Sequence, residues 1–312
     1  MAAYVIRRLW QMIPTLLGVV LLVFFLFKWF GNDPAEVLGG LNASPEQIQV
    51  IRDQLGLNKP VLDQLLIFLR QVVTLDWGRS WATNEAVAHL FATRLPATLT
   101  LMVPILFLQV LLAIPFGLTV AYLRGTLVDR TVMILATVAV SISLLVYVIV
   151  FQYLFAFRLG WFPVQGWSDS FWTNLTNYSL LPIVVQVVVA LSPYTRLYRT
   201  FFLDEIGHDY VRTARAKGLS ERVILLKHVM RNAMIPILTN ISVALPDIFV
   251  GSFLLEVFFS IPGLGRETLL AVNRGDYPVI QAFAIYIAAL TMVINLATDL
   301  LYRLVDPRVV LK

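Results

Sequence analysis

Long apolar runs recur along the chain and are separated by shorter polar segments. Six of these runs contain roughly the 20 residues that an α-helix needs to cross about 30 Å of hydrocarbon. They cover Leu9–Phe30, Thr98–Leu123, Thr131–Phe157, Leu180–Tyr198, Ala233–Phe258 and Ile280–Tyr302. The pattern therefore predicts an all-α membrane protein with six transmembrane helices.

The segment between the first two spans, residues 31–96, has the pattern of a folded loop rather than a slack one. Ser44 is a suitable N-cap, the next residue is proline, and Gln47 stands where a capping box places a glutamine. These signals predict a short helix over Pro45–Leu55. A second helix is expected from Pro60 to Thr74.

The second of these helices carries four leucines that we expect on one side. They are Leu62, Leu65, Leu66 and Leu69. Two roles stay open for the loop as a whole. It can shield the helix bundle as a cap, or it can form a docking surface for an external partner.

The composition excludes a soluble globular protein. Of the 312 residues, 59% are hydrophobic and only 14% are charged, whereas soluble domains carry roughly 25% charged residues. A compact soluble protein of this composition would lack the polar groups that cover a surface. The bilayer is therefore the expected solvent. The first apolar run is too long for the h-region of a signal peptide, so we expect it to remain as an anchor.

The positive charge follows the loops between the spans. Lys and Arg number 15 on the side that carries both termini and eight on the other side, with Lys28 inside the end of the first span. Because short cytoplasmic loops carry the excess of these residues, both termini are expected in the cytoplasm. Lys28 can snorkel to the outer interface. Topology thus explains the net charge of +5, and membrane lipid, not nucleic acid, is the expected partner.

The sequence lacks the signatures of catalysis and of cofactor binding. It has no cysteine, and the three histidines, His89, His208 and His228, do not have metal-ligand spacing. No Gly-x4-Gly-Lys-Ser/Thr motif occurs, so the chain cannot hold ATP phosphates in a P-loop. A nucleophile elbow is also missing. We therefore expect no enzymatic activity, metal site or cofactor of the chain's own.

The most informative polar segment lies between the fourth and fifth spans. Asp209–Lys217 contains strong helix formers, Gly218 interrupts them, and Ser220 with Glu221 begins a second helix. This predicts a helix–turn–helix elbow on the cytoplasmic face. The small side chains near the glycine would let another protein surface approach closely. A basic helix pair that lies on anionic lipid is the competing interpretation.

Asp247 falls near the middle of the fifth span, where an ionised carboxylate costs roughly 2.5–3.5 kcal/mol on insertion scales. We expect it to face a cavity or a partner, and we take it together with Ser242 as a candidate for the lining of a translocation pathway. Glu256 and Asp299 lie near span ends and are expected to reach water or a neighbouring subunit. One function that Asp247 leaves open is a secondary transporter coupled to protons or sodium, in which Asp247 would be the proton or ion relay.

Seven short motifs follow one another along the chain. They are Arg7-Arg8-Leu9 with Ile13-Pro14-Thr15, Leu55-Gly56-Leu57 with Lys59-Pro60, Asp76-Trp-Gly-Arg-Ser80, Arg94-Leu-Pro-Ala-Thr98, Ile261-Pro-Gly-Leu-Gly-Arg266, Arg274-Gly-Asp-Tyr-Pro278 and Asp306-Pro-Arg308. In this order they resemble the inner-membrane subunits of ATP-binding-cassette importers of the dipeptide/oligopeptide/nickel branch. The elbow stretch from Arg212 to Gly218, with His228 to Pro236 behind it, resembles the EAA loop of that family.

The resemblance implies a type I importer permease of the bacterial inner membrane. Its implied partners are a second, homologous permease, two cytoplasmic ATPases that bind ATP and Mg, and an extracytoplasmic solute-binding protein. The elbow would dock on an ATPase through Arg212, Thr213, Ala214, Arg215, Ala216, Lys217, Gly218, Leu219, Ser220 and Glu221. Di- or oligopeptides are the favoured cargo, and nickel complexes or other small solutes fit the same scaffold.

The expected organisation has four parts. Residues 1–30 form the N-terminal segment and first span, 31–96 the outer helical loop, 97–302 the five-helix core with the elbow at 204–232, and 303–312 a cytoplasmic tail.

Overall fold

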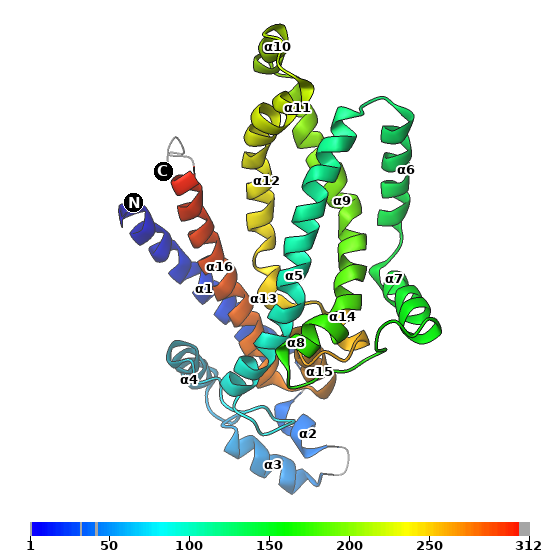
Figure 1. Ribbon diagram of the computed structural model, residues 1–312. Coiled ribbons are helices and arrows are strands. Elements are labelled where there is room, and N and C mark those ends of the chain that lie inside the picture. Colours follow the sequence, from blue (N-terminus) through cyan, green and yellow to red (C-terminus); the bar gives the residue numbers. More distant parts are fainter. Residues whose placement is uncertain (1, 32, 41–42, 306–312) are drawn as a thin grey trace. The chain divides into compact units, whose positions relative to one another are not determined.

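The computed structural model describes residues 2–305 apart from residue 32 and residues 41–42 (Figure 1). Within that part of the chain every regular element is a helix, and Arg79 and Ala86 form one isolated antiparallel bridge. The all-α fold is therefore as predicted. The closing motif at Asp306–Arg308 lies outside the described residues.

Five described helices are long and apolar enough to cross a membrane, and a sixth span is present if one strongly bent helix pair is counted as a span. The five cover Tyr4–Phe30, Val87–Tyr122, Leu180–Ile206, Glu221–Phe258 and Tyr277–Leu300. These agree in order with five of the predicted spans. The bent pair takes the place of the third.

The third predicted span, Thr131–Phe157, is therefore not one straight helix. α6 (Leu127–Ser141) ends at Ile142, and α7 (Leu144–Phe151) leaves at 93° and continues into the π-helix η1 (Gln152–Arg158). Ser143 caps α7 by accepting the backbone N–H of Leu145. Hydropathy does not reveal the bend, because the residues on both sides of it are apolar.

The fifth span is interrupted as well. α12 (Met230–Ala244) is followed by the four-residue α13 (Asp247–Val250) and by α14 (Phe253–Phe258). Pro246 has no N–H to donate to the preceding turn. Gly251 has a φ of 81°, in the left-handed region that a glycine adopts without strain. The span is thus split at two points on either side of α13.

The chain divides into two compact units. The first contains the chain up to Ala97 and from Gly263 onward, and the second is Thr98–Pro262. α5 (Val87–Tyr122) runs unbroken across this boundary, so it starts earlier than the predicted second span. Each unit has a hydrophobic core of its own.

In the first unit α1 (Ala2–Phe30) packs along α16 (Tyr277–Val305). Arg8 on α1 forms an ion pair of 3.0 Å with Asp299 on α16. Tyr4 donates its hydroxyl to the same carboxylate at 2.7 Å. Asp299 therefore joins two helices of one chain.

The outer loop contains the two predicted helices, α3 (Pro45–Gln54) and α4 (Val61–Thr74). The capping box is confirmed, because Ser44 N donates to the Gln47 side chain at 3.0 Å and Gln47 N donates to the Ser44 hydroxyl at 3.3 Å. Two further helices of this unit were not predicted. They are α2 (Pro34–Gly39) and α15 (Leu264–Arg274).

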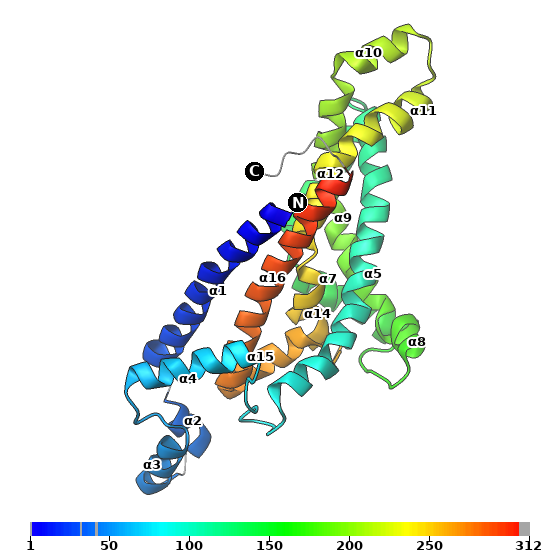
Figure 2. The same ribbon diagram turned by 90° about the vertical axis from the view of Figure 1, so that its left-hand side faces the viewer.

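α4 lies across the end of α1, and the contact between them is apolar (Figure 2). Leu65 and Leu69 pack against a buried cluster that includes Phe24 of α1. Leu62 and Leu66, in contrast, are 66% and 56% exposed. The leucines expected on one side are thus divided between two faces, because α4 has an apolar stripe wider than the surface that it covers.

In the second unit α5, α9 (Leu180–Ile206) and α12 gather around a shared core (Figure 1). α5 and α9 are in close contact at Gly117, where an added Cβ would lie 3.0 Å from the Cβ of Tyr198. α6 and α7 also pack on α9. Two short elements precede α9: α8 (Phe171–Thr173) and the π-helix η2 (Asn174–Tyr178).

Candidate functional site

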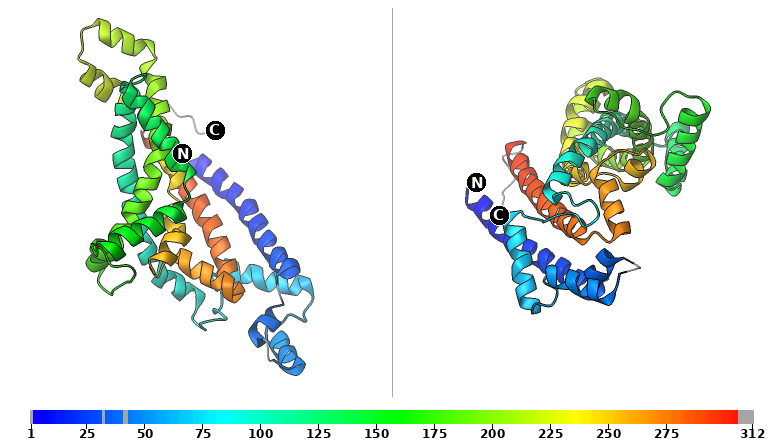
Figure 3. Two further views of the ribbon diagram at one scale, coloured as in Figure 1. Left: turned by 90° about the vertical axis from the view of Figure 1, so that its right-hand side faces the viewer. Right: turned by 90° about the horizontal axis from the view of Figure 1, so that it is seen from below.

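The predicted elbow is present at one tip of the second unit (Figure 3). α10 (Asp209–Ala216) has Lys217 as its C-cap and is followed by Gly218, whose φ is 76°. Gly218 N donates to Arg215 O at 2.9 Å and Leu219 N to Ala214 O at 3.3 Å. This pair of bonds is a Schellman closure, which requires a left-handed residue at the glycine.

A second helix follows the closure. α11 (Glu221–Val223) continues through the π-helix η3 (Ile224–Val229) directly into α12. The elbow is therefore a rigid extension of the fifth span. Arg215 reaches across the turn with two hydrogen bonds to the Glu221 carboxylate, of 2.8 and 3.3 Å. The bond to Glu221 raises the pKa of the Arg215 guanidinium above its usual value.

The base of the elbow is anchored in the core of the second unit. Val211 and Ala214, on one side of α10, are buried with Phe202 of α9, Ile224 of η3 and Ala233 of α12. Ala214 therefore faces the chain's own interior rather than a partner. A displacement of α10 would be transmitted directly to α9 and α12, because the core that these helices share is close-packed.

The other face of the elbow is open. Its exposed residues are Arg212, Thr213, Arg215, Ala216, Lys217, Gly218, Leu219 and Ser220, with Glu221 half-buried. An added Cβ at Gly218 would meet no atom within 4 Å. Six of the ten predicted contact residues thus form one uninterrupted exposed stretch from Arg215 to Ser220. Arg212 and Thr213 precede it on the first helix.

The start of α10 is tied to the end of α9. Tyr210 donates its hydroxyl to Glu205 at 2.6 Å. Burial, together with this hydrogen bond, raises the pKa of Tyr210 to about 12. The phenol therefore stays protonated and remains a donor at physiological pH.

A second polar clamp of this unit was not predicted. Arg199 on α9 binds Asp129 at the start of α6 through two hydrogen bonds of 2.8 Å. Asp129 also accepts Gly125 N at 2.9 Å. The two side chains are only 17% and 7% exposed. The sequence signal for this ion pair was that Asp129 and Arg199 are charged residues at the ends of apolar spans, where a charge without a partner costs free energy.

Asp247 lines a cavity of ≈ 240 Å³ in the second unit. The other polar side chains of its wall are Gln109 of α5 and Gln186 and Tyr194 of α9. The carbonyl oxygen of Gln186 is buried and has no hydrogen-bond partner among the described residues. The cavity therefore presents acceptor groups. These neighbours could not be predicted, since they come from helices far apart in the sequence.

Ser242 does not line this cavity, although it was grouped with Asp247. Its hydroxyl donates to Leu238 O within α12 at 2.8 Å. The expectation that Glu256 reaches water or a neighbour is wrong, because its side chain is fully buried and accepts a hydrogen bond of 3.0 Å from Thr98. Gly251 packs against this carboxylate and leaves no space for a Cβ. Glu256 thus stabilises the second break of the span.

The described residues contain no group of three or more His, Cys, Asp or Glu side chains that could hold a metal ion. The chemistry that the sites support is therefore contact with a partner at the elbow and polar recognition in the Asp247 cavity.

Comparison with known proteins gives matches over nearly the whole chain. Residues 113–311 match the family described as the inner membrane component of binding-protein-dependent transport systems, and residues 1–102 match the N-terminal family of the same membrane components. A Brucella abortus protein named as a peptide transport system permease is 35% identical over 311 residues, with 99% of each chain covered.

Two further relatives have the same coverage. The di/tripeptide transport system permease protein of Pseudomonas aeruginosa is 32% identical over 332 residues, with 99% of each chain covered. The glutathione transport system permease protein of Salmonella choleraesuis is 35% identical over 309 residues, again with 99% of each chain covered.

Proposed function

This chain belongs to the family of inner membrane components of binding-protein-dependent transport systems, and we propose that it forms one half of a membrane pathway for small peptides. It is a multi-pass permease subunit of an ATP-binding-cassette importer in the inner membrane, and it is not itself an enzyme. Family membership overturns the alternative of a proton- or sodium-coupled carrier based on Asp247.

Di- and oligopeptides are the proposed cargo. Relatives that align over 99% of their length are named as dipeptide, di/tripeptide and glutathione permeases. Dipeptides, tripeptides and glutathione are all small molecules that contain amide groups and have charged ends. A pathway for them needs polar side chains inside an apolar bundle, and the Asp247 cavity supplies such side chains.

Three kinds of partner complete the proposed importer. An extracytoplasmic binding protein delivers the peptide, a second and homologous permease completes the pathway, and two ATPases bind ATP and Mg. The proposed topology has both termini and the elbow in the cytoplasm, in keeping with the excess of Lys and Arg on that side. The outer loop then lies on the side of the membrane where the binding protein delivers the peptide.

The elbow is the proposed coupling element between the ATPase and the pathway. One observation carries this proposal: the elbow has a buried face and an exposed face. Val211 and Ala214 are buried in the core, and Gly218 lies at an exposed turn. When the ATPases close or open, a docked elbow would move with them. Because η3 continues into α12 without a break, the movement reaches α12, the part of the span that directly precedes Asp247. This is a rigid-body coupling of the kind that transporters use.

The Asp247 cavity is the proposed peptide contact within the pathway. The Asp247 carboxylate and the free carbonyl oxygen of Gln186 are both acceptors. They suit a donor group such as the ammonium of a peptide N-terminus. The breaks on either side of α13 resemble the discontinuous helices that form substrate sites in other transporters.

Purification of the chain from native membranes in mild detergent, followed by mass spectrometry of the co-purifying proteins, tests the assembly. We expect a homologous permease and one or two P-loop ATPases in the complex. Recovery of the chain only as a homo-oligomer would contradict the proposal.

A further inference from the structure

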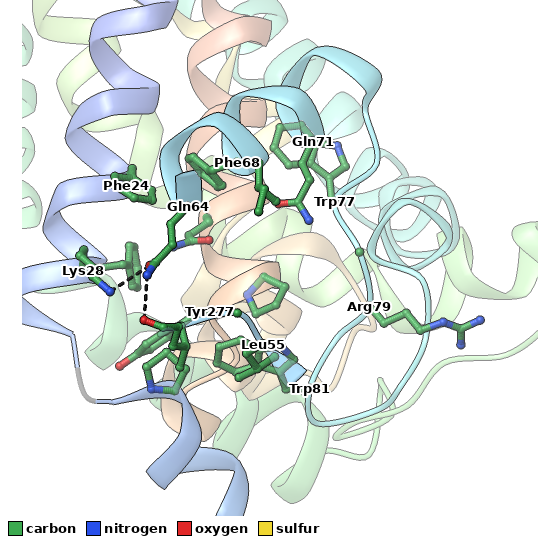
Figure 4. A pocket seen from close by; sticks show the side chains of 18 residues that line it. Phe24, Lys28, Leu55, Gln64, Phe68, Gln71, Trp77, Arg79, Trp81 and Tyr277 are labelled. Carbon is green, nitrogen blue, oxygen red and sulfur yellow. Dashed lines mark hydrogen bonds between the residues drawn. The ribbon is translucent and has the colours of Figure 1, made fainter. Parts of the chain in front are cut away.

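A second cavity, of ≈ 290 Å³, lies within the first unit (Figure 4). It is formed by the end of α1, Pro34 of α2, the turn at residues 55–57, α4 and the segment after it, and the start of α16. Its aromatic wall consists of Phe24, Phe27, Phe68, Trp77, Trp81 and Tyr277. This volume is close to the lower limit of about 300 Å³ for small-molecule sites. None of its residues belongs to the elbow or to the Asp247 cavity.

The one ammonium group of this cavity is held in place by an ordered amide. Lys28 donates to the side-chain oxygen of Gln64 at 2.9 Å, as the dashed line in Figure 4 shows. The amide nitrogen of Gln64 in turn donates to Leu57 O and Lys59 O, each at 2.8 Å. These two hydrogen bonds therefore hold the Gln64 side chain in one orientation. Gln64 positions Lys28 at the cavity rather than neutralising it.

The cavity is positive and lacks a compensating charge. An ammonium has three N–H donors, and Gln64 accepts one of those of Lys28. None of the lining residues is acidic, and Lys28 forms no ion pair with any residue that the structure describes. Arg79 also lines the cavity, but its guanidinium extends away in Figure 4 and donates to Asn84 O. Two donors of Lys28 are thus left for an anion.

The surroundings place this anion site at the level of lipid head groups. Lys28 is in the last turn of a span, next to Trp29, which is 67% exposed. Aromatic and basic side chains are typical of the membrane–water interface. α4 exposes apolar side chains on its outer face, among them Leu62, Leu66 and Ile67, and Ile67 is also part of the cavity wall. An apolar helix face that no other part of the unit covers favours a position in the interface plane.

We propose that this cavity binds the phosphate head group of an anionic phospholipid in the outer leaflet. Lys28 donates to the phosphate, and the aromatic wall contacts the glycerol and the first methylene groups of an acyl chain. A free anion would satisfy Lys28 but would leave the part of the cavity along the aromatic wall unfilled. The site fits a ligand that carries an anion and an apolar body together.

The test uses the importer complex purified with its partners in detergent and measures bound lipid by native mass spectrometry. The probes are phosphatidylglycerol and phosphatidylcholine with identical acyl chains. We expect the complex to retain phosphatidylglycerol in preference. Lys28→Gln should lower that preference about fivefold, as expected for the loss of one basic residue at a membrane surface. Lys28→Arg should preserve it.

Lys59→Gln is the matched control, because it removes the same charge from the same unit and Lys59 does not line the cavity. It should leave the preference unchanged. Equal loss in the two glutamine variants, or unchanged preference in Lys28→Gln, would overturn the proposal. Displacement of phosphatidylglycerol by glycerol 3-phosphate at equal concentration would also overturn it, since the site would then recognise a soluble anion.

Discussion

Gly218→Asp is the substitution that separates the folding of the elbow from its proposed role in coupling. Gly218 has a φ of 76°, and an added Cβ would meet no atom within 4 Å. The cost is therefore confined to placing an L-residue in the left-handed region, roughly 1–2 kcal/mol. Aspartate tolerates this region better than most residues, so we expect about 1 kcal/mol. That is small beside the roughly 5–15 kcal/mol of a folded domain.

The functional effect should be larger than this loss of stability. In the docked importer the new carboxylate would stand at the exposed turn against the ATPase. A disturbance of about 1.4 kcal/mol in that contact corresponds to about tenfold in the coupling equilibrium. We expect ATP-driven peptide uptake in proteoliposomes to fall about tenfold, while expression and membrane insertion match the wild type. ATP hydrolysis, measured in the same vesicles, should continue without uptake.

Gly160→Asp is the control for this experiment. Gly160 has a φ of 65° and also has no atom within 4 Å of an added Cβ, so the backbone cost is the same. It lies outside the elbow, and uptake should be unchanged. Normal uptake by Gly218→Asp, or an equal fall in both variants, would refute the coupling role of Gly218.

Three further substitutions test other parts of the structure. Arg199→Met leaves Asp129 buried without its partner and should destabilise the chain by about 3 kcal/mol. The loss is measured as a lower melting temperature of the purified complex. The double variant Arg199→Met with Asp129→Leu should recover most of this loss of stability. Gly117→Val should lower the melting temperature, because even a Cβ at this position lies 3.0 Å from that of Tyr198, and an unchanged value would show that α5 and α9 are not in close contact. Asp247→Asn should reduce uptake of peptides with a free N-terminus more than uptake of N-acetylated peptides, and an equal effect on both would contradict ammonium recognition.

The spans and the elbow could be predicted because their signals are local. Runs of apolar residues determine where a helix can cross a bilayer, and Gly218 after Asp209–Lys217 is a stop signal that depends on the backbone alone. The capping box at Ser44 and Gln47 is local in the same way. These features need no knowledge of the rest of the fold.

The breaks and the polar clamps could not be predicted, because they depend on residues far apart in the sequence. Asp129 and Arg199 are 70 residues apart and meet only when α6 packs on α9. Glu256 lies near a predicted span end, yet it is buried because the chain turns at Gly251 and brings Thr98 to it. Hydropathy describes how apolar a segment is and not what it packs against.

ATP-driven uptake of a labelled dipeptide tests the central claim most directly. The chain is reconstituted in proteoliposomes with its co-purified permease and ATPases, and the binding protein is supplied on the opposite side from ATP. We predict uptake that requires both ATP and the binding protein and that persists when the proton gradient is dissipated. Uptake by this chain alone, driven by a pH gradient without ATP, would contradict the account.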